Sequence, residues 1–309
     1  MSFILLGILN SQAAAGGGPI VAVAGYVAGG FNGSIRVDTV DKLAFPGETI
    51  STLATGLSVI RNALTGFSNA NVAGYAAGGL SASNRNTVDK LAFPGDTRTT
   101  LGTGLSSGRR SLAGFSDNTV AGYAAGGLSA SAVSTVDKFA FPADSRTTLA
   151  TGLSSARQRL AGFADPSVAG YAAGGSTGSL VSTVDKFTFP SDSRITLATG
   201  LSNSRDVVAA FADNAVAGYV LGGPEPPTTT VDKFALPSDT RSTLASGLSR
   251  AKFSGAGFAN SGVAGYYLGG DSAFRTDEIE KFAFPSDTNS VLTTVLSDNN
   301  DQSGAMQNA

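Results

Sequence analysis

Residues 120–127 read Val-Ala-Gly-Tyr-Ala-Ala-Gly-Gly, and a version of this octapeptide occurs six times along the 309-residue chain. Successive copies are 47 to 49 residues apart, with the tyrosine at Tyr26, Tyr75, Tyr123, Tyr171, Tyr219 and Tyr266. Self-similarity at a fixed period of this length is typical of proteins in which each unit packs against its neighbours. The copies therefore predict one repeat array, although the chain length alone would suggest two domains.

Each copy reads as four short strands. The small apolar run around Tyr123 is typical of a strand buried on both faces, and Gly126-Gly127 ends it with a turn. Residues 135–141 alternate in polarity until Pro142, a Thr-rich segment follows, and a last strand begins near a basic residue and runs into Gly-Phe. Gly, Pro and Thr recur too often for a helix. We expect an all-β protein with six blades of four antiparallel strands.

This order of residues resembles the kelch repeat: an Arg, a strand, Gly-Tyr with a Gly-Gly doublet, a strand ending near an aromatic residue, and a Thr-rich strand. The resemblance covers about residues 20–297 and implies a six-bladed β-propeller. The sequence departs from the family pattern in the last strand, where Leu101, Leu149, Leu197 and Leu244 stand in place of the usual Trp.

The ring needs six copies of every strand, but the strand that contains Gly-Phe is clear only five times. Counting back from Tyr26 places residues 13–18 where the missing strand should lie. We therefore expect the N-terminal side to complete the first blade. The predicted division is an apolar peptide at 1–12, a propeller at 13–297 and a loosely held polar tail at 298–309.

The composition argues against catalysis. The chain contains no His and no Cys, so it lacks the usual general base near neutral pH and any thiolate nucleophile or metal ligand. The formal net charge is −2, which leaves no basic surface for nucleic acid. Acids, Lys and Arg recur in register with the repeat, and ion pairs within and between blades explain them more simply than six metal or substrate sites. We expect no enzyme activity, cofactor or metal.

The loops between the second and third strands differ from blade to blade, whereas the strands around them barely change. Antiparallel strands place these loops on one face, together with the loops that join consecutive blades. Either this face binds a partner, or the loops drift because nothing constrains them. The candidate binding residues are Arg36, Asn84, Arg85, Phe274 and Arg275.

The N-terminal segment is apolar and too short to span a bilayer, so no membrane span is predicted. It lacks the basic residues of a signal peptide, and we expect it to be retained. An exposed apolar segment would cause association unless it is docked on its own ring or on another subunit. The expected anchor residues are Phe3, Ile4, Leu5, Leu6, Ile8 and Leu9.

This peptide, followed by Asn-Ser-Gln-Ala-Ala, resembles the N-termini of structural proteins of tailed bacteriophages, especially marine and cyanobacterial ones. The resemblance implies a virion component, such as a capsid decoration, tail or fibre protein that binds other virion proteins and can form homo-oligomers. The alternative is a carbohydrate-binding or receptor-binding module, secreted or on a cell surface. An enzyme ranks third.

Overall fold

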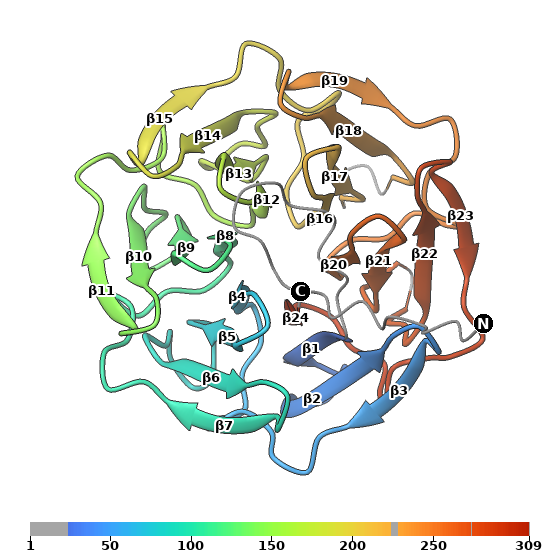
Figure 1. The fold of residues 1–309 in the computed structure, drawn as a ribbon, viewed down its shortest axis with the longest axis horizontal. Coiled ribbons are helices and arrows are strands. Elements are labelled where there is room, and N and C mark those ends of the chain that lie inside the picture. Colours follow the sequence, from blue (N-terminus) through green and yellow to red (C-terminus); the bar gives the residue numbers. More distant parts are fainter. Residues whose placement is uncertain (1–23, 224–227, 273, 309) are drawn as a thin grey trace, which may run out of the picture.

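The computed structural model describes residues 24–223, 228–272 and 274–308, and this part of the chain consists of strands and turns without a helix. Its 24 strands form six four-stranded antiparallel sheets, which stand around a central axis (Figure 1). The prediction of an all-β, six-bladed β-propeller with four antiparallel strands per blade is confirmed.

In each blade the strands lie side by side from the axis outward. From the innermost strand to the outermost, the first blade contains β24 (Gly304–Asn308), β1 (Ala24–Phe31), β2 (Arg36–Ala44) and β3 (Thr49–Thr52); the second, β4 (Thr65–Asn69), β5 (Ala73–Ala77), β6 (Val88–Ala92) and β7 (Thr97–Thr100); the third, β8 (Ala113–Asp117), β9 (Ala121–Ala125), β10 (Val136–Ala140) and β11 (Ser145–Thr148); the fourth, β12 (Ala161–Asp165), β13 (Ala169–Ala173), β14 (Val184–Thr188) and β15 (Ser193–Thr196); the fifth, β16 (Ala209–Asp213), β17 (Ala217–Leu221), β18 (Val231–Ala235) and β19 (Thr240–Thr243); the sixth, β20 (Ala256–Asn260), β21 (Ala264–Leu268), β22 (Ile279–Ala283) and β23 (Thr288–Val291).

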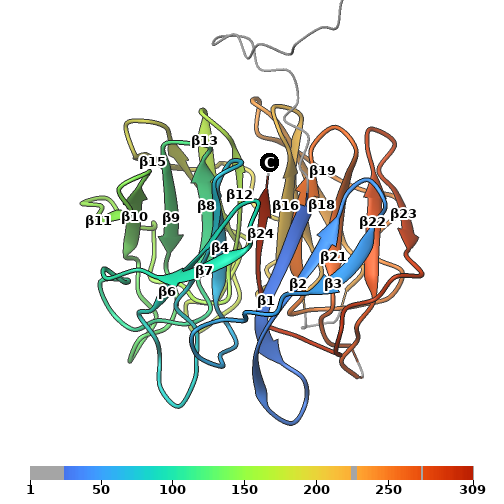
Figure 2. The same ribbon diagram turned by 60° about the horizontal axis from the view of Figure 1, so that its bottom comes forward.

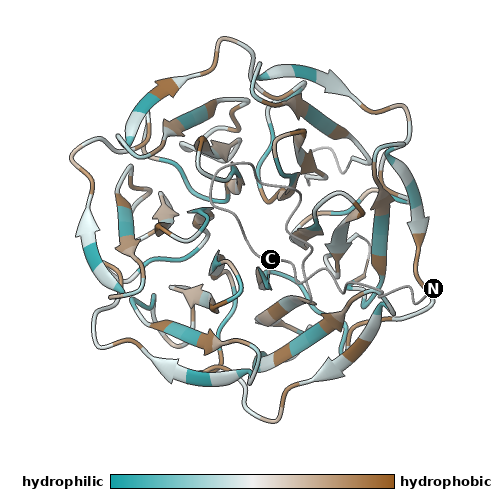
Figure 3. Ribbon diagram, viewed as in Figure 1, coloured by the Kyte–Doolittle hydropathy of each residue, from teal (hydrophilic) through white to brown (hydrophobic). Residues whose placement is uncertain are grey.

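The Gly of each Gly-Tyr pair lets neighbouring blades approach closely. A methyl group at Gly122 in β9 would collide with the ring of Phe67 in β4 of the preceding blade, so only Gly fits there. The second strand is buried on both faces, as its small apolar residues predict. The third strand alternates, so that Phe139 is buried while Lys138 is partly exposed, and Figure 3 shows this alternation of hydropathy.

A three-residue clamp joins each blade to the next. Tyr123 Oη and Lys138 Nζ of the third blade each donate to the Asp192 carboxylate of the fourth, both at 2.7 Å. Burial, and then the hydrogen bond to the carboxylate, raises the pKa of this tyrosine, which keeps its hydroxyl a donor. The equivalent clamps complete the ring with Tyr26, Lys42 and Asp96; Tyr75, Lys90 and Asp144; Tyr171, Lys186 and Asp239; Tyr219, Lys233 and Asp287; and Tyr266, Lys281 and Glu48.

A second recurring charge cluster lies inside five of the six blades. In the fourth blade, the side chains of Arg157 and Asp185 are fully buried and lie 2.6 Å apart. The carboxylate also accepts hydrogen bonds from Ser154 and Thr196, and the guanidinium donates to two backbone carbonyls. Equivalent pairs are Arg61 and Asp89, Arg109 and Asp137, Arg205 and Asp232, and Lys252 and Glu280. The prediction that the repeated charges form structural ion pairs is confirmed.

Arg157→Met should lower the free energy of unfolding by about 3–5 kcal/mol, because it leaves the Asp185 carboxylate buried without its cation. The matched control is Arg194→Gln, whose guanidinium is 26% exposed and 3.7 Å from the same carboxylate, and which should cost less than about 1 kcal/mol. Urea denaturation of both variants measures the difference. Equal losses for the two variants would contradict the assignment of the buried pair as the structural one.

The expectation about ring closure is wrong. The innermost strand of the first blade is β24, at the C-terminal side, where Ala24 pairs with Asn308 and Ala28 with Gly304. The tail assigned to 298–309 is therefore part of the propeller, and Met306 is 2% exposed. Met306 takes the position of Phe in the other blades, since its side chain packs on Gly74 of the second blade. Residues 13–18 lie outside the described residues.

Candidate functional site

The ring has two different faces. One, here called the variable face, carries the loops between second and third strands and the loops between consecutive blades; the other, the turn face, carries the remaining turns. In the side view of Figure 2, the loop between β1 and β2 extends at the bottom, and the arrow of β24 points the opposite way. The topology thus places the variable loops together, as the sequence predicted.

A closed circle of backbone hydrogen bonds surrounds the axis on the variable face. In each blade, the residue two positions before the innermost strand donates its N–H to the carbonyl of its counterpart in the preceding blade, at 2.7 to 2.8 Å. All six adopt left-handed backbone angles, with φ between 52° and 60°. We call this circle the rim; it consists of Ala63, Ser111, Arg159, Val207, Ser254 and Gln302.

The rim side chains differ although their backbone is the same. They range from a methyl group to a guanidinium, and none is the Gly that left-handed angles favour. Val207 is the most costly, because a β-branched side chain is an outlier in this conformation, at about 1–2 kcal/mol. Strained residues of this kind often lie at functional sites. The rim combines a constant frame with six variable side chains.

The rim opens into a cavity of about 570 Å³ on the axis, within the size range of small-molecule sites. Besides the rim residues, Arg110, Gln158, Phe253 and Ser303 contribute to its lining. The cavity ends at a waist of small residues from the six innermost strands: Gly66, Gly114, Gly162, Ala210, Gly257 and Ala305.

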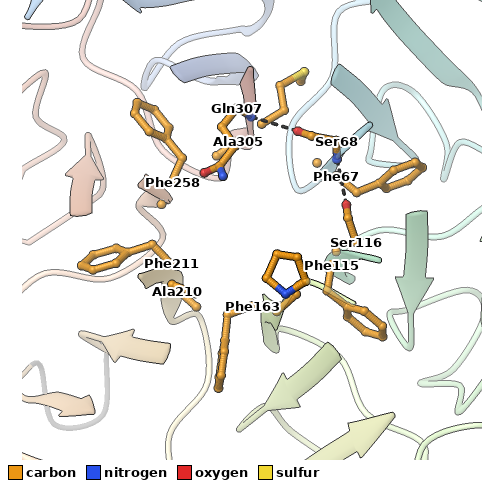
Figure 4. Close-up of a pocket in the computed structure, with 18 of the residues that line it drawn as sticks. Phe67, Ser68, Phe115, Ser116, Phe163, Ala210, Phe211, Phe258, Ala305 and Gln307 are labelled. Carbon is orange, nitrogen blue, oxygen red and sulfur yellow. Dashed lines mark hydrogen bonds between the residues drawn. The ribbon is translucent and has the colours of Figure 1, made fainter. Parts of the chain in front are cut away.

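Backbone forms most of the waist, because four of its six residues are Gly and adjacent strands approach closely there. A methyl group at Gly114 would collide with the carbonyl oxygen of Gly66. On the turn side lies a smaller space of about 130 Å³, from which the phenylalanine rings point away (Figure 4). Ser68 Oγ there accepts a hydrogen bond from the Gln307 N–H at 2.9 Å. The channel along the axis is therefore wider at the variable face than at the turn face.

The residues proposed from the sequence lie on the variable face, around the wide end of this channel. Arg36 donates to Asn62 at 3.0 Å, and Asn84 accepts from Arg110 at 2.9 Å. Both partners directly precede rim residues. Arg85 is partly buried in the same loop as Asn84.

The other two proposed residues lie where the sixth blade meets the first. Phe274 is 82% exposed. Arg275 stacks on Phe31, with its guanidinium carbon 4.7 Å from the ring centroid, and forms an ion pair with Asp301 at 3.2 Å. Burial raises the pKa of Asp301, and the arginine opposes this shift. The anchor residues Phe3, Ile4, Leu5, Leu6, Ile8 and Leu9 lie outside the described residues.

Sequence reasoning missed the cavity residues themselves. None of the five proposed residues lines the cavity, whereas Arg110, Arg159, Phe253 and Gln302 do. A signal was available: the position after the buried basic residue reads Asn, Arg, Gln, Asp, Phe and Asp in successive repeats, and the following rim position varies as well. Aligning the repeats column by column would have found both positions.

Comparison of the chain with protein-family models and with curated proteins found no match. Within residues 24–223, 228–272 and 274–308, no cluster of three or more His, Cys, Asp or Glu side chains could hold a metal ion. In the same part of the chain, no helix is long and apolar enough to cross a membrane. The fold is compatible with protein–protein interaction, and the geometry directs attention to the variable face.

Proposed function

We propose that this protein is a non-enzymatic structural component of a virus particle, such as a capsid decoration, tail or fibre protein, and that its variable face contacts a host surface or another protein. The observation that carries the proposal is the rim: six equivalent positions share one strained backbone geometry and carry five different side-chain types. A scaffold that is repeated everywhere else supports variation at this place, as expected of a binding surface.

The two faces of the ring suit two different contacts, one for attachment and one for binding. Ala24 pairs with Asn308 at the turn face, so the chain that precedes Ala24 joins the ring on the side opposite the variable face. Equivalent valines are 40 to 50% exposed on that turn face, at Val72, Val120, Val168, Val216 and Val263. Attachment through the turn face and the apolar peptide would leave the variable face free for contact.

Deletion of residues 1–10 should abolish incorporation of the protein into virus particles, because it removes the apolar anchor, while the ring still folds. Particles purified from a virus that carries each version are compared by immunoblot, and circular dichroism verifies the fold of the deleted protein. Arg194→Gln, on an outermost strand, is the control and should be incorporated normally. Unchanged incorporation of the deletion would contradict the anchor; absence of the wild-type protein from particles would contradict the virion role.

A further inference from the structure

We propose that the cavity inside the rim binds a sugar that carries a carboxylate, with Arg110 and Arg159 contacting the acid group. This inference rests on the proposed function, since it names the chemistry that the variable face would recognise on a host surface. Its first support is the shape of the site. The cavity of about 570 Å³ opens at the variable face, and beyond the waist the space narrows to about 130 Å³, so the room for a ligand lies on the variable side.

The charge of the lining is the second support. Arg110 and Arg159 line the cavity, and its described lining contains no Asp or Glu. The two arginines come from adjacent blades, and the Arg159 N–H donates to the carbonyl of Ser111, the residue next to Arg110, at 2.8 Å. Their backbones are therefore neighbours across one blade junction. Guanidinium groups bind carboxylates with paired, charge-assisted hydrogen bonds.

Both guanidinium groups are positioned by contacts outside the cavity. Arg110 Nη1 donates to Asn84 Oδ1 at 2.9 Å, and Arg159 Nη1 lies 3.4 Å from Asp206 Oδ2. Asp206 is nearly buried, whereas the Arg159 side chain remains 53% exposed. Asp206 offsets part of the Arg159 charge, which suits a monoanion better than a doubly charged phosphate.

The neutral groups of the lining indicate a polyhydroxylated ligand. Ser111, Gln158, Gln302 and Ser303 supply hydroxyl and amide groups that can both donate and accept hydrogen bonds. Phe253 adds one apolar ring to the same lining, against which the C–H face of a sugar could pack. Two cations, six neutral polar side chains and one aromatic ring match an acidic sugar better than an acidic peptide, which would need more cations.

The test measures binding of glucuronic acid and N-acetylneuraminic acid to the full-length protein by isothermal titration calorimetry, with glucose and galactose as neutral probes. We expect both acids, or one of them, to bind and the neutral sugars to bind at least tenfold more weakly. Arg110→Gln and Arg159→Gln should each weaken acid binding about tenfold or more, because each removes a charge-assisted hydrogen bond. Arg250→Gln is the matched control: its guanidinium is 46% exposed, pairs with Glu278 and does not line the cavity, so it should bind normally.

Three results would overturn the inference: equal binding of neutral and acidic sugars, unchanged binding by both arginine variants, or no sugar binding together with binding of a Glu-rich peptide that depends on the same arginines. Circular dichroism and urea denaturation of the variants verify that each is folded, because Arg159→Gln also removes the cation next to the buried Asp206. Failure here leaves the proposed function testable on its own, because incorporation of the protein into particles requires no sugar.

Discussion

Raising the pH above about 10 is expected to unfold the protein abruptly. All seven tyrosines of the sequence are buried, and burial raises the pKa of each above its ordinary value. In the unfolded chain they ionise near pH 10, whereas in the folded ring they keep their protons. A group whose pKa is raised on folding contributes stability below its unfolded pKa, and that contribution is lost as pH rises towards the folded pKa.

The size of this effect follows from the number of groups. Seven tyrosines that stay protonated in the ring cost about 10 kcal/mol of stability at a pH of about 11, which is comparable to the whole stability of an ordinary domain. The chain has no His and no Cys, so no side chain with an ordinary pKa between about 5 and 8 adds a second transition at neutral pH.

Urea midpoints measured from neutral to strongly alkaline pH, together with tyrosinate absorbance, would test this expectation. Stability should stay nearly flat up to about pH 9 and fall steeply above about pH 10. The double variant Tyr123→Phe/Tyr171→Phe is the control: it removes two of the seven linked protons and should reduce the alkaline slope by roughly two sevenths. A slope that does not change in this variant would mean that other groups cause the unfolding.

The fold was predictable because each strand and turn of a blade has a sequence motif that recurs in every repeat. Each Gly-Tyr, Gly-Gly and Val-Asp-Lys marks one strand or turn, so six copies of Tyr123 and its neighbours give six blades. The ion pairs were predictable in kind, since charges that recur with the repeat must serve every blade. Their partners were not, because the period does not say that Tyr123 reaches Asp192, 69 residues away, in the next blade.

Ring closure was not predictable from the same markers. The last strand has Ala305-Met306 in place of Gly-Phe, and Asn300 in place of the buried Arg or Lys. Met is close enough to Phe in volume and adaptability to fill the same place, so packing tolerates a change that hides the pattern. Asn300 donates to the Gly29 carbonyl at 2.7 Å, the contact that Arg157 makes to Gly174 in the fourth blade.

The candidate site was predictable as a face but not as a cavity. Loop variation and strand direction were enough to place Arg36, Asn84 and Arg275 on the variable face. Which residues surround the axis depends on how the six blades pack against one another. The rim residues adopt left-handed backbone angles but none is Gly, so the sequence does not indicate the turn. Arg110 and Arg159 are 49 positions apart, and only the backbone contact between their blades makes them neighbours.

Removal of residues 304–309 is expected to open the ring, because it deletes β24. The deletion leaves the β1 backbone from Ala24 to Ala28 without its inner partner and empties the place of Met306 beside Gly74. Loss of a buried Met alone costs about 2–5 kcal/mol, and each lost hydrogen bond about 1 kcal/mol more. The sum is comparable to the total stability of a domain, so the truncated protein should lose cooperative unfolding and aggregate through the exposed strand edge.

Differential scanning calorimetry and size-exclusion chromatography of the truncated protein would measure this loss, with an equally long deletion of residues 2–7 as the control. The N-terminal deletion should unfold at the wild-type temperature, since it leaves all 24 strands of the six blades in place. Addition of a synthetic peptide of residues 298–309 should restore a folded ring to the C-terminal deletion, because the peptide contains β24, whose backbone pairs with Ala24 to Ala28 of β1. A truncated protein that unfolds like the full chain would show that the first blade does not need β24.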